Sequence, residues 1–399
     1  MDGEVGRLEF STHSVVNGNA EIQFNTAVEL FPVLKAREFY RTIGFKEIAF
    51  IYGNTENSFR KTIALINRIR YQEENGTPYR TLQENTEKEG ADLNQHIENK
   101  TKTILAQNNF TSEGCYQGDN QTYLQTIPVT LAKKMVSKAA ENFSDNYSVT
   151  DILNNPVCYE YPEKTVNISI DDVNVKKQEE TRTRKDNSEE RRRKYVHNTV
   201  VHIGKGQKSY TLNGHGMKTV LSYLIAFLFN SGLTGNRFQF FTDGHTTLNK
   251  TIINSFRWYK DLGIILDWYH LEKKCKEQLS MALKGRKIRN QVLEQLMPIL
   301  WHGITDKGIV LLKKIDSTLI KDESKRDKLI EYLKRNKPYI PCYAIRKELG
   351  LRNSSNIGEK MNDLVVSNRQ KHNGMSWSKE GSIALASITA LKRNNESKN

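Results

Sequence analysis

The chain has 399 residues, more than one compact domain usually needs, and 37% of them are hydrophobic, which is enough for a core of ordinary size. Sixty Lys and Arg residues against 46 Asp and Glu residues give a net charge of +14, which attracts polyanions such as nucleic acid. The longest apolar run, Val220 to Phe229, is half of the roughly 20 residues that a membrane-spanning helix needs. We therefore expect a buried helix there and no membrane partner.

The N-terminus and the cysteines indicate where the protein is located. The first residues lack the basic start and apolar stretch of a signal peptide. The four cysteines stand far apart, without a Cys-x-x-Cys pair, at Cys115, Cys158, Cys275 and Cys342. This pattern predicts reduced cysteines in a cytoplasmic protein, and it indicates neither a disulfide framework nor a zinc site.

Residues 1 to about 160 are polar, with apolar residues at helical spacing. One such set runs from Ile63 to Ile69 and another from Leu131 to Phe143. We expect a mostly helical N-terminal domain over residues 1–163. Within it, residues 132–153 fit either a helix-turn-helix or two ordinary core helices, and the loose pattern favours the second interpretation.

The pattern changes at Lys164, where residues with strand alternation begin. Strands are predicted at 166–170, 196–203, 209–212, 237–242 and 263–267. Helices are predicted at 217–230 and 247–259, through most of 270–348 with breaks at Gly303 and Pro338, from about 354, and at 379–391. The very charged segment 176–194 is expected to be an exposed loop. Three adjacent strands followed by alternating helices and strands are typical of an α/β fold, a mixed sheet with helices on its faces.

Acidic residues lie where predicted strands end or where a late helix presents a face. Asp171 and Asp172 end the first strand, Asp243 precedes the flexible Gly244, and Glu359 lies on the helix that begins near residue 354. A lone Asp at a strand end is more often a turn residue, so none of these positions carries the argument by itself.

Together, however, such carboxylates suit phosphodiester chemistry, in which two divalent ions about 4 Å apart activate the attacking oxygen and stabilise the leaving one. Crowded carboxylates repel one another unless a cation neutralises them, and Mg²⁺ prefers oxygen ligands. The sequence therefore predicts a site for Mg²⁺ or Mn²⁺, with two ions held by Asp171 or Asp172 together with Asp243 and Glu359.

Several motifs occur in a characteristic order. They are Thr242-Asp243-Gly244-His245, Asp267-Trp268-Tyr269-His270, Asn356-Ile357-Gly358-Glu359-Lys360-Met361-Asn362 and the tail from Asn368 to Ser378. In this combination the chain resembles bacterial insertion-sequence transposases of the DDE class, particularly the Mutator-like and ISLre-type groups. The resemblance covers roughly residues 164–395.

The resemblance implies an RNase H-like catalytic domain over residues 164–399, with helices on both faces of its sheet and a helical insertion at about 271–345. The N-terminal domain would then bind the ends of the transposon DNA. Asp171, Asp243 and Glu359 would be the catalytic and metal-binding residues. Where the family often has Asp-Gly, this chain has Asp171-Asp172, so Asp172 stays an alternative for the first position.

The resemblance also implies the reaction and the partners. DNA hydrolysis at the end of the element frees a 3′-OH, and the same site aligns that 3′-OH for attack on target DNA. The enzyme would work as a homo-oligomer on DNA, associated with the nucleoid, without a small-molecule cofactor. Two alternatives stay open, namely a structure-specific nuclease that cuts without joining and a catalytically inactive, domesticated DNA-binding protein.

Some residues near the predicted site have two interpretations. Asp267 and His270 are either auxiliary site residues or, respectively, a helix cap and a packed side chain. His245 is expected to contact a helix N-terminus rather than a ligand. Trp377 is expected to anchor the last helix in the core, with Ser376 or Ser378 as its cap.

DNA contacts are predicted around the Glu359 helix. The basic cluster at Arg369, Lys371 and His372 follows that helix, and the amides of Asn356 and Asn362 share its expected polar face. The apolar face, which we expect to pack against the core, contains Ile357, Met361 and Leu364. The clusters at 182–184 and 191–194 fit a DNA contact or a solvated loop equally well.

Overall fold

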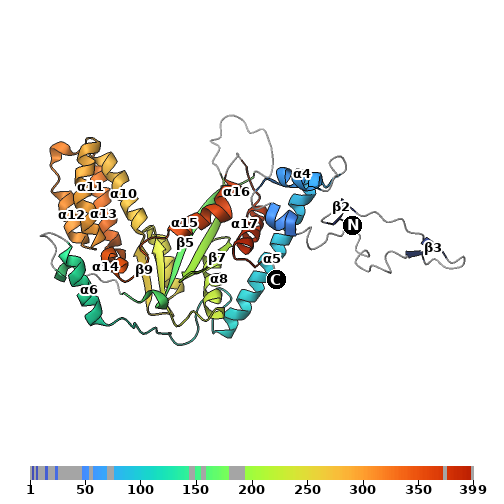
Figure 1. Cartoon of the computed structure of the whole chain (residues 1–399), viewed down its shortest axis with the longest axis horizontal. Helices are drawn as coiled ribbons and strands as arrows, with labels where there is room; N and C mark the ends of the chain where they lie inside the picture. The colour runs from blue at the N-terminus through green and yellow to red at the C-terminus, as the bar shows by residue number, and fades with distance from the viewer. Residues whose placement is uncertain are drawn as a thin grey trace. The chain divides into compact units, whose positions relative to one another are not determined.

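The computed structural model describes residues 47–53, 57–69, 76–142, 149–153, 159–178, 194–371 and 375–396, and four short strands near the start of the chain (Figure 1). These are β1 (Asp2–Gly3) paired with β2 (Gly6–Arg7), and β3 (Ser14–Val16) paired with β4 (Gln23–Asn25). Most of the predicted charged loop, including the cluster at 182–184, lies outside the described residues.

Contacts divide the chain into two compact units. One comprises Met1–His96, Asn174–Asn198 and Leu364–Asn399, and the other comprises Ile97–Val173 and Thr199–Asp363. This division differs from the predicted boundary between residues 163 and 164, because residues 97–163 pack with the sheet and its helices.

The centre of the second unit is a mixed five-stranded sheet in the order β7-β6-β5-β8-β9. The strands are β5 (Thr165–Lys176), β6 (Tyr195–Lys205), β7 (Lys208–Gly214), β8 (Arg237–Thr242) and β9 (Leu262–Leu266). β8 runs parallel to both β5 and β9, whereas β6 and β7 are antiparallel. The predicted order of strands and helices is confirmed. β5 continues to Lys176, so Asp171 and Asp172 lie within the strand and do not end it as predicted. The parallel pairing of β5 with β8 ends at Ser169 and Phe241, so Asp171 lies at the same edge as the residues that follow β8 and β9.

Helices cover this sheet. α8 (Met217–Asn230) occupies the predicted range, and α9 (Thr246–Ser255) follows β8 but ends earlier than predicted. Val166, Ile168 and Ile170 of β5 are buried in one cluster with Leu221 and Leu224 of α8. The apolar run of α8 is therefore a core helix, and within the described chain no helix is long and apolar enough to cross a membrane.

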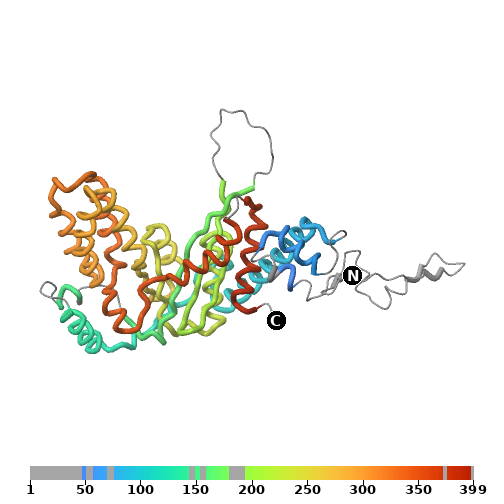
Figure 2. The backbone as a smooth tube through the Cα atoms, turned by 45° about the horizontal axis from the view of Figure 1, so that its top comes forward, coloured from blue at the N-terminus to red at the C-terminus, as the bar shows by residue number. Residues whose placement is uncertain are grey.

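The predicted helical insertion follows β9 and has a core of its own. Its helices are α10 (Trp268–Ala282), α11 (Arg286–Trp301), α12 (Thr305–Lys313), α13 (Glu323–Asn336) and α14 (Tyr343–Glu348). α10 to α13 lie side by side in both views (Figure 2), and they bury Leu279, Leu296 and Leu333 among others. Gly303, with φ +73°, ends α11, and Pro338 lies in the short 3-10 turn after α13, as predicted.

The helix-turn-helix interpretation of residues 132–153 is not supported by packing. α6 (Val129–Glu141) and α7 (Val149–Leu153) bury Val136, Ala139 and Ile152 in one cluster with Ile345 of α14. A recognition helix needs a free face for the major groove. The buried positions instead fit two ordinary core helices; the residues between them, 143–148, lie outside the described chain.

The first unit is built from helices of both ends of the chain. α4 (Phe59–Ile69), the start of α5 (Tyr79–Gln107) and α17 (Lys379–Arg393) belong to it. Trp377 is 6% exposed and its indole N–H donates to the backbone oxygen of Gln370 at 3.1 Å, while the Ser378 hydroxyl caps α17. The prediction that Trp377 anchors the last helix is confirmed.

Candidate active site

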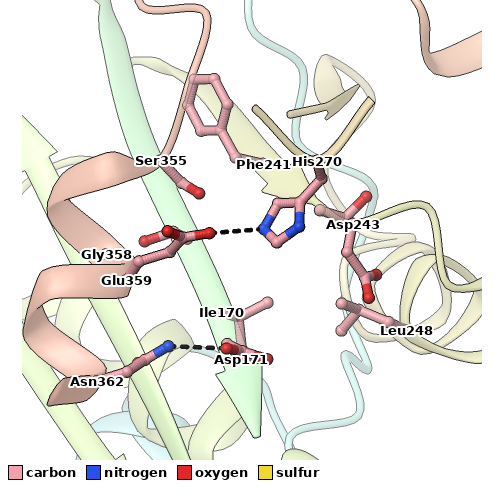
Figure 3. Close-up of a pocket in the computed structure, with 12 residues that line it drawn as sticks. Ile170, Asp171, Phe241, Asp243, Leu248, His270, Ser355, Gly358, Glu359 and Asn362 are labelled. Atoms are coloured by element: carbon pink, nitrogen blue, oxygen red, sulfur yellow. Dashed lines mark hydrogen bonds and ion pairs between the residues drawn. The ribbon is translucent and has the colours of Figure 1, made fainter. Parts of the chain in front are cut away.

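Asp171 lies on β5 at the edge where the parallel strands end. Ile168 and Ile170 point into the core, so the alternating residues Ser169 and Asp171 lie on the opposite face of the strand. On that face they line a pocket together with Asp243, His270 and Glu359 (Figure 3). Side chains from β5, from the turn after β8, from α10 and from one late helix therefore surround one cavity.

The Asp243 turn is held in a single conformation by a neighbouring helix. Gly244 has φ +83°, and a Cβ atom there would lie 2.8 Å from Oδ1 of Asn336 on α13, so glycine is required for both reasons. The Tyr332 hydroxyl donates to the backbone oxygen of Asp243 at 3.1 Å. The backbone N–H of His245 donates to Oδ1 of Asp243 at 2.9 Å, and His245 is the N-cap residue of α9, which agrees with its expected place at a helix start.

Glu359 reaches the pocket because α15 (Asn356–Asn362) comes unusually close to β5. A Cβ atom on Gly358 would lie 2.7 Å from Cβ of Ser169, which leaves no room for any side chain other than hydrogen. In this position Oε1 of Glu359 is 2.9 Å from Nε2 of His270, on α10. Figure 3 shows α15 with Glu359 and Asn362 facing β5, and His270 beside Asp243 across the pocket.

Asp267 and His270 turn out to have different roles. Asp267 is buried and accepts from the backbone N–H of Tyr269 at 2.8 Å, so the helix-cap interpretation is confirmed for it. Its second oxygen accepts from the backbone N–H of Ser355, which connects the start of α10 with the start of α15. His270 instead lines the pocket and contacts Glu359, so the interpretation of His270 as a packed side chain is wrong.

The neighbouring residues Asp171 and Asp172 have different partners in the structure. Asp172 accepts from the Thr199 hydroxyl of β6 and is not among the residues that line the pocket. Its backbone N–H donates to Oδ1 of Asp171 at 2.8 Å, while the amide of Asn362 donates to Oδ2 of Asp171 at 2.8 Å. Asp171 is thus oriented from both sides, and the geometry favours it over Asp172 as the first carboxylate.

The pocket carries unfavourable negative charge. Burial raises the pKa of Asp171 above its usual range; the Asp172 amide opposes this shift, and the charge of Asp243 adds to it. Among the described residues no group of three or more His, Cys, Asp or Glu side chains is already gathered around a metal position. The donor set itself, three carboxylates lining one pocket, fits a hard cation such as Mg²⁺.

The raised pKa of Asp171 leads to a prediction about stability. The folded chain favours protonated Asp171 more than the unfolded chain does, so this residue's contribution to the free energy of unfolding falls as the pH rises through the raised pKa. Asp171→Asn cannot ionise, but its one amide oxygen can replace only one of the two carboxylate oxygens, which accept from Asn362 and from the backbone N–H of Asp172. The lost hydrogen bond lowers the melting temperature at every pH, so the pH dependence is the readout. Without divalent ions, we expect the melting temperature of the variant relative to wild type to rise by roughly 1–3 °C between pH 3 and pH 7. A difference between variant and wild type that is the same at both pH values would contradict this account.

Two predicted DNA-binding residues, Arg369 and Asn362, are buried. Arg369 is 4% exposed, with its guanidinium 5.1 Å from the ring of Phe59 and 5.0 Å from that of Trp377, and burial lowers its pKa to about 10. Arg369 therefore packs against two rings of the first unit, and this burial does not favour a contact with a phosphate. Asn362 is also buried; its amide donates to Asp171 and it lines the pocket, so its contact with DNA stays a prediction.

The other predicted DNA contacts have different outcomes. Asn356 and Lys371 are exposed, which is compatible with a role in binding, and that role stays a prediction. His372 lies outside the described residues.

The predicted packing face of the Glu359 helix is wrong at Ile357, while Met361 and Leu364 are half-buried. Ile357 is 42% exposed, whereas Gly358 and Asn362 are buried against β5. The reason is that α15 has only seven residues and continues as the π-helical segment η6 (Asp363–Ser367), which changes the periodicity. The buried face therefore combines small and polar side chains.

Sequence reasoning missed two residues that build the site. Ser169 provides the surface on which α15 lies, and Tyr332, far along the chain in the insertion, fixes the Asp243 turn. The small residues Ser169 and Gly358 beside two acidic positions were the available signal for the first contact. No feature of the sequence around Tyr332 indicated the second.

Comparisons with known proteins provide no family for the chain. No family model, no curated protein and no solved structure matches it.

Proposed function

We propose that the chain is a DDE transposase that cuts DNA at the ends of an insertion sequence and joins the freed ends to target DNA. The observation that carries the proposal is that Asp171, Asp243, Glu359 and His270 line one pocket. A mixed sheet whose central strand carries the first carboxylate, and whose parallel neighbour ends at the second, supports an RNase H-like core. The net charge of +14 supports DNA as the partner.

In this proposal, bound Mg²⁺ ions would activate the attacking oxygen and stabilise the leaving oxygen of a phosphodiester. The three carboxylates would hold these ions, and Asn362 keeps Asp171 turned toward the pocket. The charge of the ions would offset the repulsion between Asp171 and Asp243. The protein's contribution is positioning and charge, and the reaction needs no covalent enzyme intermediate.

His270 can assist by proton transfer. Its Nε2 atom is 2.9 Å from Glu359 and its ring lines the same pocket, with 31% of the side chain exposed. An imidazole so placed can take up a proton from an attacking hydroxyl group or deliver one to a leaving oxygen. Its role as an auxiliary residue is part of the proposal.

The function is tested with DNA fragments that carry the sequences flanking the coding region, labelled at their ends. With Mg²⁺ we expect cleavage at a defined position and joining of the 3′ end to a second DNA, and with EDTA neither. Cleavage without joining would favour the structure-specific nuclease. Retained DNA binding with neither reaction would favour the inactive, domesticated protein.

DNA binding should depend strongly on salt and should survive loss of a catalytic carboxylate. Phosphate contacts release counterions, so the affinity should fall steeply between about 50 and 200 mM salt. Asp243→Asn removes a negative charge from the pocket, so it should bind end DNA at least as tightly as wild type. Fluorescence anisotropy on a labelled duplex, without divalent ions, measures both effects. A folded variant that binds more weakly would contradict the placement of the DNA beside Asp243.

A further inference from the structure

A second, smaller pocket adjoins the carboxylate pocket. The two share Ser169 and Gly358 as a common wall, and the Ser355 side chain lines both. The second pocket is bounded by β5, β6 and the segment that leads into α15. The second pocket is therefore directly adjacent to the carboxylate pocket.

The chemistry of the second pocket is opposite to that of the first. It is lined by Arg352, His202 and Asn167, and none of the described residues that line it is acidic. Arg352 reaches into the space over Gly204, where a Cβ atom would lie 3.1 Å from its Nη1 and 3.8 Å from Nε2 of His202. The absence of a side chain at position 204 gives the guanidinium its place beside the imidazole.

Buried polar atoms in this pocket have no partner among the described residues. His202 is only 4% exposed, and its Nε2 is unpaired, while its Nδ1 lies 3.5 Å from the Thr211 hydroxyl. Oδ1 of Asn167 is also unpaired. A half-turn of that amide would present its NH₂ group to the pocket instead. Unpaired buried polar atoms are costly and rare, so atoms of this kind around one pocket indicate a ligand.

The charge state of the pocket fits an anion. Burial, and then the charge of Arg352, lower the pKa of His202 to about 4, so the imidazole is neutral near pH 7. If the Thr211 hydroxyl donates to Nδ1, the proton of the neutral ring is on Nε2 and is directed to the pocket. One fixed positive charge with neutral donors around it matches a singly charged phosphodiester group.

We propose that this pocket holds one phosphate of the DNA strand, next to the phosphate that is cut, with Arg352 as the charged donor and His202, Asn167 and Ser355 as neutral donors. The inference rests on the proposed function for the identity of the strand. The carboxylate pocket and the second pocket lie on either side of the Ser169–Gly358 contact. They would hold two successive phosphates of one DNA strand, the first through bound cations and the second directly. Arg352 is in this sense a positioning residue.

The test observes His202 directly by NMR of the full-length protein, in EDTA so that no cutting takes place. The ring signals of His202 are identified by their loss in His202→Gln. The probes are dithymidine monophosphate, which contains one phosphodiester, its uncharged methylphosphonate analogue, and inorganic phosphate. We expect the diester to shift the His202 signals and to raise the pKa of His202 from about 4, because the anion offsets the charge of Arg352. The methylphosphonate should do neither.

Two variants complete the design. Arg352→Gln should abolish the response to the diester, whereas Lys347→Gln, which removes an exposed charge on the neighbouring α14, should retain it. Because the comparison of diester and methylphosphonate uses the wild-type protein, it holds even if Arg352→Gln does not fold. An unchanged His202 with the diester, or an equal response to the methylphosphonate, would overturn the proposal. A response to inorganic phosphate without one to the diester would assign the pocket to a free phosphate and overturn the DNA assignment.

Failure here and failure of the proposed function can be told apart. A His202 response without DNA cleavage in any metal would leave the anion pocket standing and refute the nuclease. Metal-dependent cleavage with no His202 response would support the nuclease and refute the anion pocket.

Discussion

Glu359→Gln should fold normally and lose DNA cleavage with Mg²⁺ by several orders of magnitude. The substitution keeps the size of the side chain and removes the charge, so a ligand of the reacting metal is lost. The stability cost should be small, because the Glu359–His270 contact is partly exposed and such contacts contribute little. Melting temperature and end cleavage are measured on the same preparation.

Three outcomes of that experiment are distinct. Unchanged melting with lost cleavage supports Glu359 as the third carboxylate. A variant that cuts at nearly the wild-type rate refutes this assignment. A variant that unfolds would show that Glu359 has a structural role instead. The exposed Glu380, at the start of α17, provides the control, because Glu380→Gln should change neither quantity.

Gly358→Ala should reduce cleavage by about 100-fold without altering any charged group. The added Cβ would lie 2.7 Å from Cβ of Ser169, so α15 must move away from β5 and take Glu359 with it. A displacement of about 1 Å at a catalytic group is enough for an effect of that size. Overpacking of this kind should also lower the free energy of unfolding by about 1–3 kcal/mol.

A second substitution tests whether the collision with Ser169 causes the loss of cleavage in Gly358→Ala. Ser169→Gly removes the atoms with which the new methyl group collides, so the double variant should regain most of the cleavage lost by Gly358→Ala. Gly235→Ala is the matched control, because nothing lies within 4 Å of a Cβ atom at that glycine. If Ser169→Gly fails to restore cleavage while the double variant is folded, the close contact of α15 with β5 is not the reason for the glycine.

The sheet and its carboxylates could be predicted because they depend on short-range patterns. Alternation in residues 166–170 and the apolar stretch of α8 report burial directly, and both lie where they were expected. Asp243-Gly244 was recognisable since a sharp turn after a strand requires glycine, here with φ +83°. That Asp171 and Asp243 line one pocket depends on the parallel pairing of β5 with β8, which the order of predicted strands did not give.

Interactions between distant segments could not be predicted in the same way. Arg369 looks like a surface cation in a basic tail, and only the fold brings Phe59 and Trp377 to its two sides. The choice between Asp171 and Asp172 also depended on a partner strand, because Thr199 of β6 binds Asp172 and leaves Asp171 to the pocket.

The helix that carries Glu359 illustrates a different failure. Helical periodicity predicted Ile357 as a packing residue, which holds for a long regular helix. α15 is short, continues into a π-helical segment, and lies so close to β5 that glycine occupies the contact. The side chains that face the sheet there are selected for size and hydrogen bonding, and hydrophobicity carries little information about them.

The central claim, that Asp243 is a ligand of the ions that drive DNA cleavage, is tested most directly by exchanging its ligand atom. A thiolate is a softer ligand than a carboxylate, and it is poorly suited to Mg²⁺ but better tolerated by Mn²⁺. Asp243→Cys should therefore cut end DNA several orders of magnitude more slowly than wild type with Mg²⁺ and recover a large part of the activity with Mn²⁺. Asp172→Cys, outside the pocket, should show no such dependence on the metal. Equal cleavage by Asp243→Cys and wild type with Mg²⁺ would contradict the claim.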